Sequence, residues 1–324
     1  MARWLAGRLA QGVLTFAVAT VLLFCLMRAT PGDPLARLAG ERQIDPADVA
    51  HLRARYGLDQ PLGRQFATFV TGALRGDLGV SITYGRPVTA LLRERLPATL
   101  LLVGTVLLVD FTLGLWLGVR QALARGRALD ATLSTLSLAG YAAPSFWIGL
   151  VLAWLVGVEW RLLPAAGMAD PLLAADAPWA TRALDVARHL VLPALTLVVV
   201  SLAAAMRYQR AALLEVLAQP FMQTARAKGL PARAVVWRHG WRNALFPVLT
   251  LFGLWLPLLA SGSVFVEAVF AWPGLGSLAA EAVAGRDYPV IMGTSLLVTV
   301  LVVASALLVD LAYAWLDPRV RHWT

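Results

Sequence analysis

The sequence contains a series of apolar stretches, each about 20 residues long and interrupted by few charges. An apolar helix of about 20 residues crosses the hydrocarbon core of a bilayer, whereas β-barrel strands are about 10 residues long and alternate apolar with polar side chains. Because lipid supplies no hydrogen-bond partners for an open backbone, these stretches predict helices. We therefore expect an all-α integral membrane protein with six transmembrane helices. The expected spans are 9–27, 98–119, 131–158, 190–206, 244–266 and 290–311.

The charge distribution predicts which side of the membrane each loop faces. Short cytoplasmic loops are rich in arginine and lysine, and the loops that follow the second and fourth spans and the C-terminal tail are basic. The loop 267–289 is net acidic, with Glu267, Glu281 and Asp287 against Arg286. Both termini are thus expected in the cytoplasm. The stretches 31–95, 159–189 and 267–289 are expected outside.

The first apolar stretch has two interpretations, a cleaved signal peptide or a permanent helix. It is about 19 residues long and no small-residue cleavage motif follows it, which favours an uncleaved helix. We divide the chain into an N-terminal transmembrane helix (1–30), an extracytoplasmic insert (31–95) and a five-helix core (96–324). Within the insert, Asp45 and Pro46 are typical of a helix start. In the third span, Pro144 predicts a kink.

Several classes of chemistry find little support in the sequence. The single lysine, Lys228, precedes Gly229 rather than Ser or Thr, so there is no phosphate-binding P-loop motif. The single cysteine, Cys25, excludes an intrachain disulfide, and the four histidines are scattered. We expect no catalytic residue, no metal site and no cofactor site. The net charge of +9 is attributed to topology and anionic lipid rather than nucleic acid, because the basic residues flank apolar spans.

Asp110 lies in the middle of the second span, and intramembrane acids are functional candidates by default. One interpretation is a proton or cation relay in a self-contained carrier. The other is a structural carboxylate satisfied by a neighbouring helix or protonated. Proton-coupled carriers usually show several such groups, so we expect Asp110 to be structural.

The loop 221–243 separates two apolar spans and contains five basic residues and no acid. Pro220 suits the first turn of a helix, and Gly229 suits the left-handed position that ends one, with Pro231 just beyond. We expect a short helix over 221–229 and a second over 232–241. Positive charge alone would explain a cytoplasmic anchor, but not the small-residue core of residues 224–227.

This loop resembles the cytoplasmic "EAA" loop of ATP-binding-cassette (ABC) importer permeases, in the form found in the dipeptide/oligopeptide/nickel transport family. Ala225 is followed by Arg226, Ala227, Lys228 and Gly229 as in that pattern. Other segments match the family's first permease subunit in order. They are TPGDP (30–34), YGLDQPLGRQF (56–66), RGDLGVSITYGRPV (75–88), RLPATL (95–100), APSFWIGL (143–150), HLVLPALTL (189–197), VFAWPGLG (269–276), RDYPV (286–290) and LDPRVR (316–321).

The resemblance implies a type I ABC importer permease fold in a bacterial plasma membrane, with no enzymatic activity in this chain. It implies four partners: a second homologous permease subunit, two cytoplasmic ATP-binding subunits that hold ATP and Mg, and an extracytoplasmic substrate-binding protein. The cargo would be short peptides, or alternatively nickel or another small molecule. The implied ATPase-coupling residues are Thr224, Ala225, Arg226, Ala227, Lys228, Gly229, Arg238 and His239.

Overall fold

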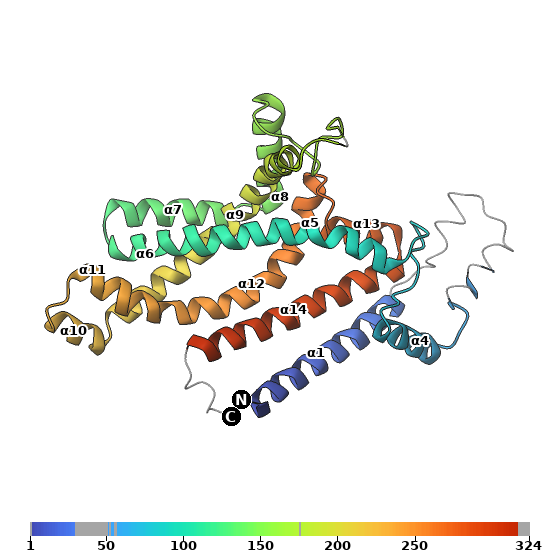
Figure 1. Ribbon diagram of the computed structural model, residues 1–324, viewed down its shortest axis with the longest axis horizontal. Coiled ribbons are helices and arrows are strands. Elements are labelled where there is room, and N and C mark those ends of the chain that lie inside the picture. The colour runs from blue at the N-terminus through green and yellow to red at the C-terminus, as the bar shows by residue number, and fades with distance from the viewer. Residues whose placement is uncertain (1, 30–50, 52, 55–56, 175, 317–324) are drawn as a thin grey trace.

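The computed structural model describes residues 2–29, 51, 53–54, 57–174 and 176–316, and this part of the chain is built almost entirely of helices (Figure 1). Elements labelled η are π-helical turns within longer helices. In chain order the elements are α1 (Ala2–Ala29), α4 (Leu62–Leu74), α5 (Val88–Val109), η1 (Asp110–Gly114), α6 (Leu115–Leu123), α7 (Ala128–Ala142), α8 (Ser145–Leu152), η2 (Ala153–Glu159), α9 (Trp179–Leu217), α10 (Pro220–Ala227), α11 (Ala232–Ala234), η3 (Val235–Trp241), α12 (Arg242–Val269), α13 (Leu275–Gly285) and α14 (Tyr288–Leu316).

The long helices form a bundle in which successive helices run in opposite directions (Figure 1). The start of α1, the turn between α6 and α7, the helix α10 and the end of α14 lie at one end of this bundle, which we call the hairpin end. At the opposite end lie α4 and α13. The apolar core between α5, α9 and α12 includes the fully or almost fully buried side chains of Leu102, Val106, Leu192, Val266 and Trp272.

Four helical segments of the described chain are long and apolar enough to cross a membrane: Ala6–Ala29, Val88–Leu123, Trp179–Leu217 and Tyr288–Leu311. The pair Ala128–Ala142 and Ser145–Glu159 adds a fifth if it counts as one broken span. The remaining predicted span falls on α12, a continuous helix of 28 residues that this count, made on the described residues, does not include. The multi-span helical fold is therefore confirmed, while six crossings remain a prediction.

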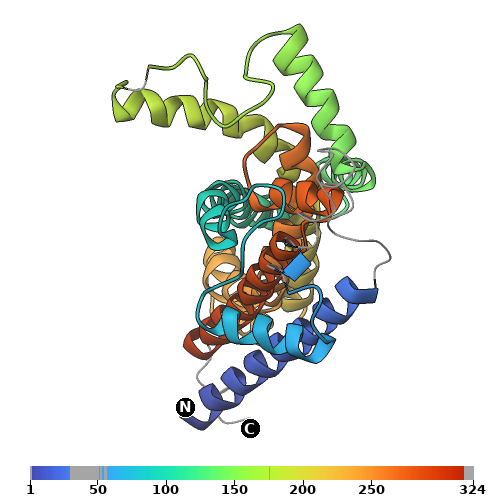
Figure 2. The ribbon, with the colours of Figure 1, turned by 90° about the vertical axis from the view of Figure 1, so that its right-hand side faces the viewer.

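The third predicted span is a broken helix rather than a kinked one, and the expected single helix was wrong in this respect. The two halves meet at 98°. Ala143 is extended with ψ 136°, and Pro144 with ψ 133° precedes the first turn of α8. Proline disfavours the helical conformation of the residue before it, so the chain leaves α7 and starts again. Figure 2 shows α8 and the first turns of α9 standing away from the bundle as two arms.

Two predicted loops contain more helix than expected. Residues 179–189 form the first turns of α9 instead of belonging to a loop, and α13 lies within the segment 267–289. The first part of the predicted insert 31–95, including the helix expected at Asp45, lies outside the described residues. The final part of the insert is described, and there α5 already begins at Val88.

Glycines allow α6 to approach α9 closely. Gly114 and Gly118 are four residues apart, and a β-carbon on Gly118 would lie 2.7 Å from the Gln209 Cβ and from the Met206 carbonyl oxygen. A β-carbon on Gly114 would lie 2.9 Å from that of Ala205. This spacing of small residues is the standard means of close helix packing in membranes. At the bundle's edge, α1 is attached to α14 by an Arg8–Asp310 ion pair of 3.1 Å.

This packing predicts that replacing glycine by alanine has opposite effects on stability at two positions of the same continuous helix. Gly118→Ala should destabilise the chain by about 1–3 kcal/mol, because the added methyl group overlaps α9. Gly104→Ala should be neutral or stabilising by up to about 1 kcal/mol, since nothing lies within 4 Å of its β-carbon. Thermal unfolding of the two detergent-solubilised variants measures the difference. Equal midpoints would contradict close packing at Gly118.

Candidate functional site

The basic loop folds as a helical hairpin, residues 220–241, which we call the basic hairpin. Its first arm, α10, has Pro220 at the first helical position and ends at Ala227, with Lys228 as the C-cap residue. Gly229 follows with φ 75°, and its N–H donates to the Arg226 carbonyl oxygen at 2.9 Å. Nothing lies within 4 Å of where a Gly229 β-carbon would stand. The backbone conformation alone therefore requires glycine here, as the sequence predicts.

The second arm of the basic hairpin continues into a membrane helix. Pro231 is extended at ψ 142°, and α11 begins at Ala232. The helix passes through η3 into α12 without leaving helical geometry, since Trp241 has φ −61° and ψ −42°. The predicted helix 232–241 is thus confirmed as the first turns of a longer helix. A displacement of the basic hairpin therefore acts directly on α12.

A small apolar core holds the two arms together. Met222 and Ala225 of α10 pack against Val235 of η3, and all three are buried. Gly240 admits this contact, because its β-carbon would lie 3.3 Å from the Met222 methyl carbon. Ala225 therefore faces into the hairpin, 7% exposed. We expected Ala225 to face a partner, but the fold of the second arm back onto α10 turns this side chain inward.

The outer surface of the basic hairpin is cationic. Of the predicted coupling residues, Thr224, Arg226, Ala227, Lys228, Gly229 and Arg238 are exposed and His239 is partly exposed. Arg233 and Arg242 are also exposed, and none of the five cations forms an ion pair with another described residue. Between them Phe221 and Trp237 remain 43% and 37% exposed. This surface suits a protein partner with an acidic, partly apolar groove.

At the opposite end, two acids of the predicted external loop 267–289 are buried. Glu267 and Asp287 are both 0% exposed. Asp287 accepts hydrogen bonds from the Ser81 hydroxyl at 2.5 Å and the Thr83 N–H at 2.9 Å, and so fixes the segment before α5 to the start of α14. The residues next to Glu267 and Asp287 in the sequence are typical of a loop. The burial of the two acids becomes visible only through partners that are distant in the sequence. Glu267 and Asp287 are thus fully buried acids in addition to Asp110.

Tyr84 adds a second link in the same region. Its hydroxyl donates a hydrogen bond to the Glu281 carboxylate on α13. Burial, together with this hydrogen bond and the charge of Glu281, raises the pKa of Tyr84 to about 12. The phenol therefore stays protonated at physiological pH and remains a donor.

Asp110 lies at the first residue of η1, 0% exposed. Ser201 of α9 faces it, but the Ser201 hydroxyl donates to its own helix at the Leu197 carbonyl oxygen, 3.0 Å away. Among the described residues, neither Asp110 carboxylate oxygen has a hydrogen-bond partner of normal geometry. The site thus lacks a described chain of acids or bases along which a proton would pass.

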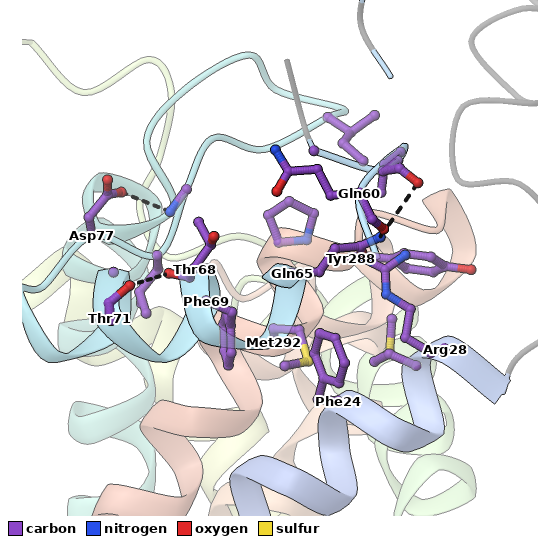
Figure 3. Close-up of a pocket in the computed structure, with 18 of the residues that line it drawn as sticks. Phe24, Arg28, Gln60, Gln65, Thr68, Phe69, Thr71, Asp77, Tyr288 and Met292 are labelled. Carbon is purple, nitrogen blue, oxygen red and sulfur yellow. Dashed lines mark hydrogen bonds between the residues drawn. The ribbon is translucent and has the colours of Figure 1, made fainter. Parts of the chain in front are cut away.

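A cavity of about 520 Å³ opens at the end opposite the basic hairpin. Figure 3 shows Arg28 of α1, Gln65 of α4 and Tyr288 of α14 around it, with Phe24 and Met292 among its apolar wall residues. Arg28 lies over the Phe24 ring, 5.6 Å from the centroid. These groups come from separate helices and include no nucleophile paired with a base. Polar groups beside an apolar wall are typical of a binding or packing surface.

Two family profiles match the chain. The profile described as "Binding-protein-dependent transport system inner membrane component" matches residues 90–322. Its N-terminal companion matches residues 1–103. Together they cover the membrane helices and the basic hairpin.

Curated relatives match over almost the whole length. The chain is 41% identical to the di/tripeptide transport system permease protein DppB of Pseudomonas aeruginosa, over 99% of each chain. It is 37% identical to the dipeptide transport system permease protein DppB of Escherichia coli K12, again over 99% of each. It is also 37% identical to the oligopeptide transport system permease protein AppB of Bacillus subtilis, over 99% of this chain and all of that one. The chain therefore belongs to the family of inner-membrane permease components of binding-protein-dependent transport systems.

Proposed function

We propose that the chain is one of two permease subunits of an ATP-driven importer of short peptides, which works by alternating access. The three relatives named above are peptide permeases by name and match over nearly their full length. The observation that supports the coupling role is the basic hairpin, an exposed cationic surface whose second arm is the start of α12. Because the chain has no P-loop motif, the energy of ATP hydrolysis would come from partner subunits.

In this proposal the hairpin end of the bundle is cytoplasmic. The basic hairpin, the arginine-rich turn after α6, the start of α1 and the end of α14 share that end (Figure 1). Positive charge in short connections marks the cytoplasmic side. Counting α12 and the broken α7–α8 pair as crossings gives six spans, with α4 and α13 on the outer side.

The basic hairpin is proposed to dock in a groove of a cytoplasmic ATP-binding subunit. Thr224, Arg226, Lys228 and Gly229 would form the contact, with Ala225 supporting them from inside the hairpin. ATP and Mg would be bound by a pair of such subunits. A second permease subunit would complete the pathway, and a substrate-binding protein would deliver the cargo from outside.

Two alternatives differ in cargo or in energy source. Nickel or another small molecule would be carried by the same machine. A self-contained proton-coupled carrier is not favoured, because the relatives are permeases of transport systems with a separate binding protein. Asp110 is accordingly proposed as a structural residue.

Topology is tested with single cysteines in a Cys25→Ser background. Ala67→Cys and Ala174→Cys should react with a membrane-impermeant maleimide in intact cells, because the outer side is assigned to α4 and the α8–α9 connection. Ala232→Cys should react only after the membrane is opened. Labelling of residue 232 from outside would overturn the assignment.

The basic hairpin is tested by three substitutions in the complete importer. Gly229→Val should lose ATP-binding-subunit association, since a β-branched residue at φ 75° is strained by roughly 1–2 kcal/mol. Ala225→Trp should overpack the hairpin core by about 1–3 kcal/mol and act likewise. Lys228→Ala should be mild, because one exposed charge is worth at most about 1 kcal/mol. Co-purification and ATP-dependent uptake of labelled di- and tripeptides measure the effects.

Gly76→Val is the matched control for that series. Gly76 has φ 78° and an open β-carbon position, but lies at the opposite end of the bundle. It should carry similar local strain and leave the association intact. If both Gly229→Val and Ala225→Trp take up peptide like the wild type, the coupling role is wrong and the basic hairpin serves only as a membrane anchor.

The structural role of Asp110 predicts that Asp110→Asn retains peptide uptake within about threefold, because the buried carboxylate lacks a described hydrogen-bond partner and its charge is costly to bury. Uptake into proteoliposomes with and without an imposed proton gradient is the measurement. Abolished uptake by a correctly assembled Asp110→Asn complex would restore the proton-relay interpretation.

A further inference from the structure

Glu267 connects three helices at the end of the bundle opposite the basic hairpin. It lies in the last turn of α12 and is 0% exposed. Its Oε1 accepts hydrogen bonds from the Thr99 hydroxyl of α5 at 2.9 Å and from the Ser263 hydroxyl of α12 at 3.0 Å. Its Oε2 accepts from the Ser277 N–H of α13 at 2.9 Å. Within the described chain no arginine, lysine or histidine pairs with this carboxylate.

The N-terminus of α13 takes the place of a counter-ion. The first N–H groups of a helix have no partner within it and carry partial positive charge. Here the Ser277 N–H points to Glu267, and the Leu275 N–H donates to the Thr99 hydroxyl at 2.7 Å. Thr99 thus accepts from α13 while it donates to Glu267. The side chains of α5 and α12 together serve as the cap of α13.

The turn before α13 is shaped around this carboxylate. A β-carbon on Gly274 would overlap the Glu267 carboxylate, and one on Gly276 would lie 2.7 Å from the Val264 Cα. Trp272 is fully buried and donates its indole N–H to the Ala98 carbonyl oxygen of α5 at 2.9 Å. The turn is therefore attached to α5 on both sides of Gly274.

We propose that Glu267 is a positioning residue that fastens α5 and α13 to the outer end of α12, so that movement of the basic hairpin reaches them through α12. The inference rests on the proposed importer function. The second arm of the basic hairpin and α12 form one continuous helix. In the proposal, one end of this helix contacts the ATP-binding subunit, and the other end is bound to α5 and α13 through Glu267. If the hydrogen bonds at Glu267 are removed, ATP hydrolysis continues, but α5 and α13 no longer follow the movement of α12.

Comparing Glu267→Gln with Glu267→Ala tests whether hydrogen bonding rather than charge is needed. Glutamine keeps an acceptor for the Ser277 N–H, and its amide donates to the Thr99 and Ser263 hydroxyl oxygens, which also accept. Alanine removes the acceptor of the Ser277 N–H and of the Thr99 hydroxyl. In proteoliposomes containing the complete importer, Glu267→Ala should lower ATP-dependent uptake of labelled dipeptide by about tenfold or more, and Glu267→Gln by no more than about threefold.

Association with the ATP-binding subunits and basal ATP hydrolysis should be unchanged in both variants, because the basic hairpin is intact. This separates the two proposals: Gly229→Val loses association, whereas Glu267→Ala hydrolyses ATP without uptake. Wild-type uptake by Glu267→Ala overturns the positioning role. Equal loss of uptake in Glu267→Gln and Glu267→Ala overturns it as well, because the charge or a proton would then be the required feature.

A pair of milder substitutions tests the same proposal if the Glu267→Ala complex does not assemble. Thr99→Val removes the hydroxyl that serves both Glu267 and Leu275, whereas Thr105→Val removes a hydroxyl of the same helix that bonds only the Leu101 carbonyl oxygen, 2.8 Å away. Thr99→Val should lose uptake while retaining hydrolysis, and Thr105→Val should retain both. Indistinguishable uptake by these two variants overturns the proposal.

Spin labels supply a direct readout of the attachment. Leu100 of α5 and Val283 of α13 are exposed, at 47% and 63%, and cysteines there would carry the labels in a Cys25→Ser background. The interlabel distance should be narrowly distributed in the parent and in Glu267→Gln, and broad in Glu267→Ala. An unchanged distribution in Glu267→Ala shows that α13 is held without Glu267 and overturns the inference.

Discussion

Every backbone N–H and C=O group that lies in lipid must find a partner within the protein, and the architecture of this chain depends on that requirement. Inside the long helices the requirement is met locally. It becomes demanding where a helix begins or ends within the fold. At those places the structure uses side chains as caps: Thr99, which is distant in sequence, and Glu267 at the start of α13, and the adjacent Asp287 at the start of α14.

The features that sequence predicted well are those decided by neighbouring residues. Apolar length predicts helices, and Pro220, Gly229 and Pro231 mark the ends of the two arms of the basic hairpin through their own backbone preferences. The structure has both arms at those places, and Gly229 has the expected positive φ. The chemistry of a cap or turn is local, so it can be recognised without knowledge of the rest of the fold.

The features that sequence reasoning missed depend on contacts between distant segments. Glu267 follows an aromatic-rich span and precedes a Trp-Pro-Gly turn, which is typical of an exposed loop, but Thr99, 168 positions away, holds it in the interior. Ala225 turns inward only because Val235 of the second arm covers it. At Pro144, composition indicates a bend, but the separation of α8 from α7 also depends on packing of Gly149 against Phe270 and Thr196.

The basic hairpin and the Glu267 cluster use polar side chains in two different ways. In the basic hairpin the cations are exposed and unpaired among the described residues, which leaves them available for a partner and sensitive to salt. At Glu267 a single buried carboxyl group is enclosed by hydroxyl and backbone donors, where ionic strength has little influence. The first arrangement suits an association that has to be selective, and the second suits a joint that has to keep its geometry.

The unbroken course of the chain from α11 through η3 and α12 has a mechanical consequence. At 1.5 Å per residue, the helical path from Ala232 to the end of α12 at Val269 is no longer than about 57 Å. A tilt of roughly 5° about the hairpin end would shift the far end of such a lever by up to about 5 Å, close to one helical turn. In the proposed mechanism, a small tilt at the docking surface would thus become a larger shift at the far end of α12, without any change of secondary structure along the way.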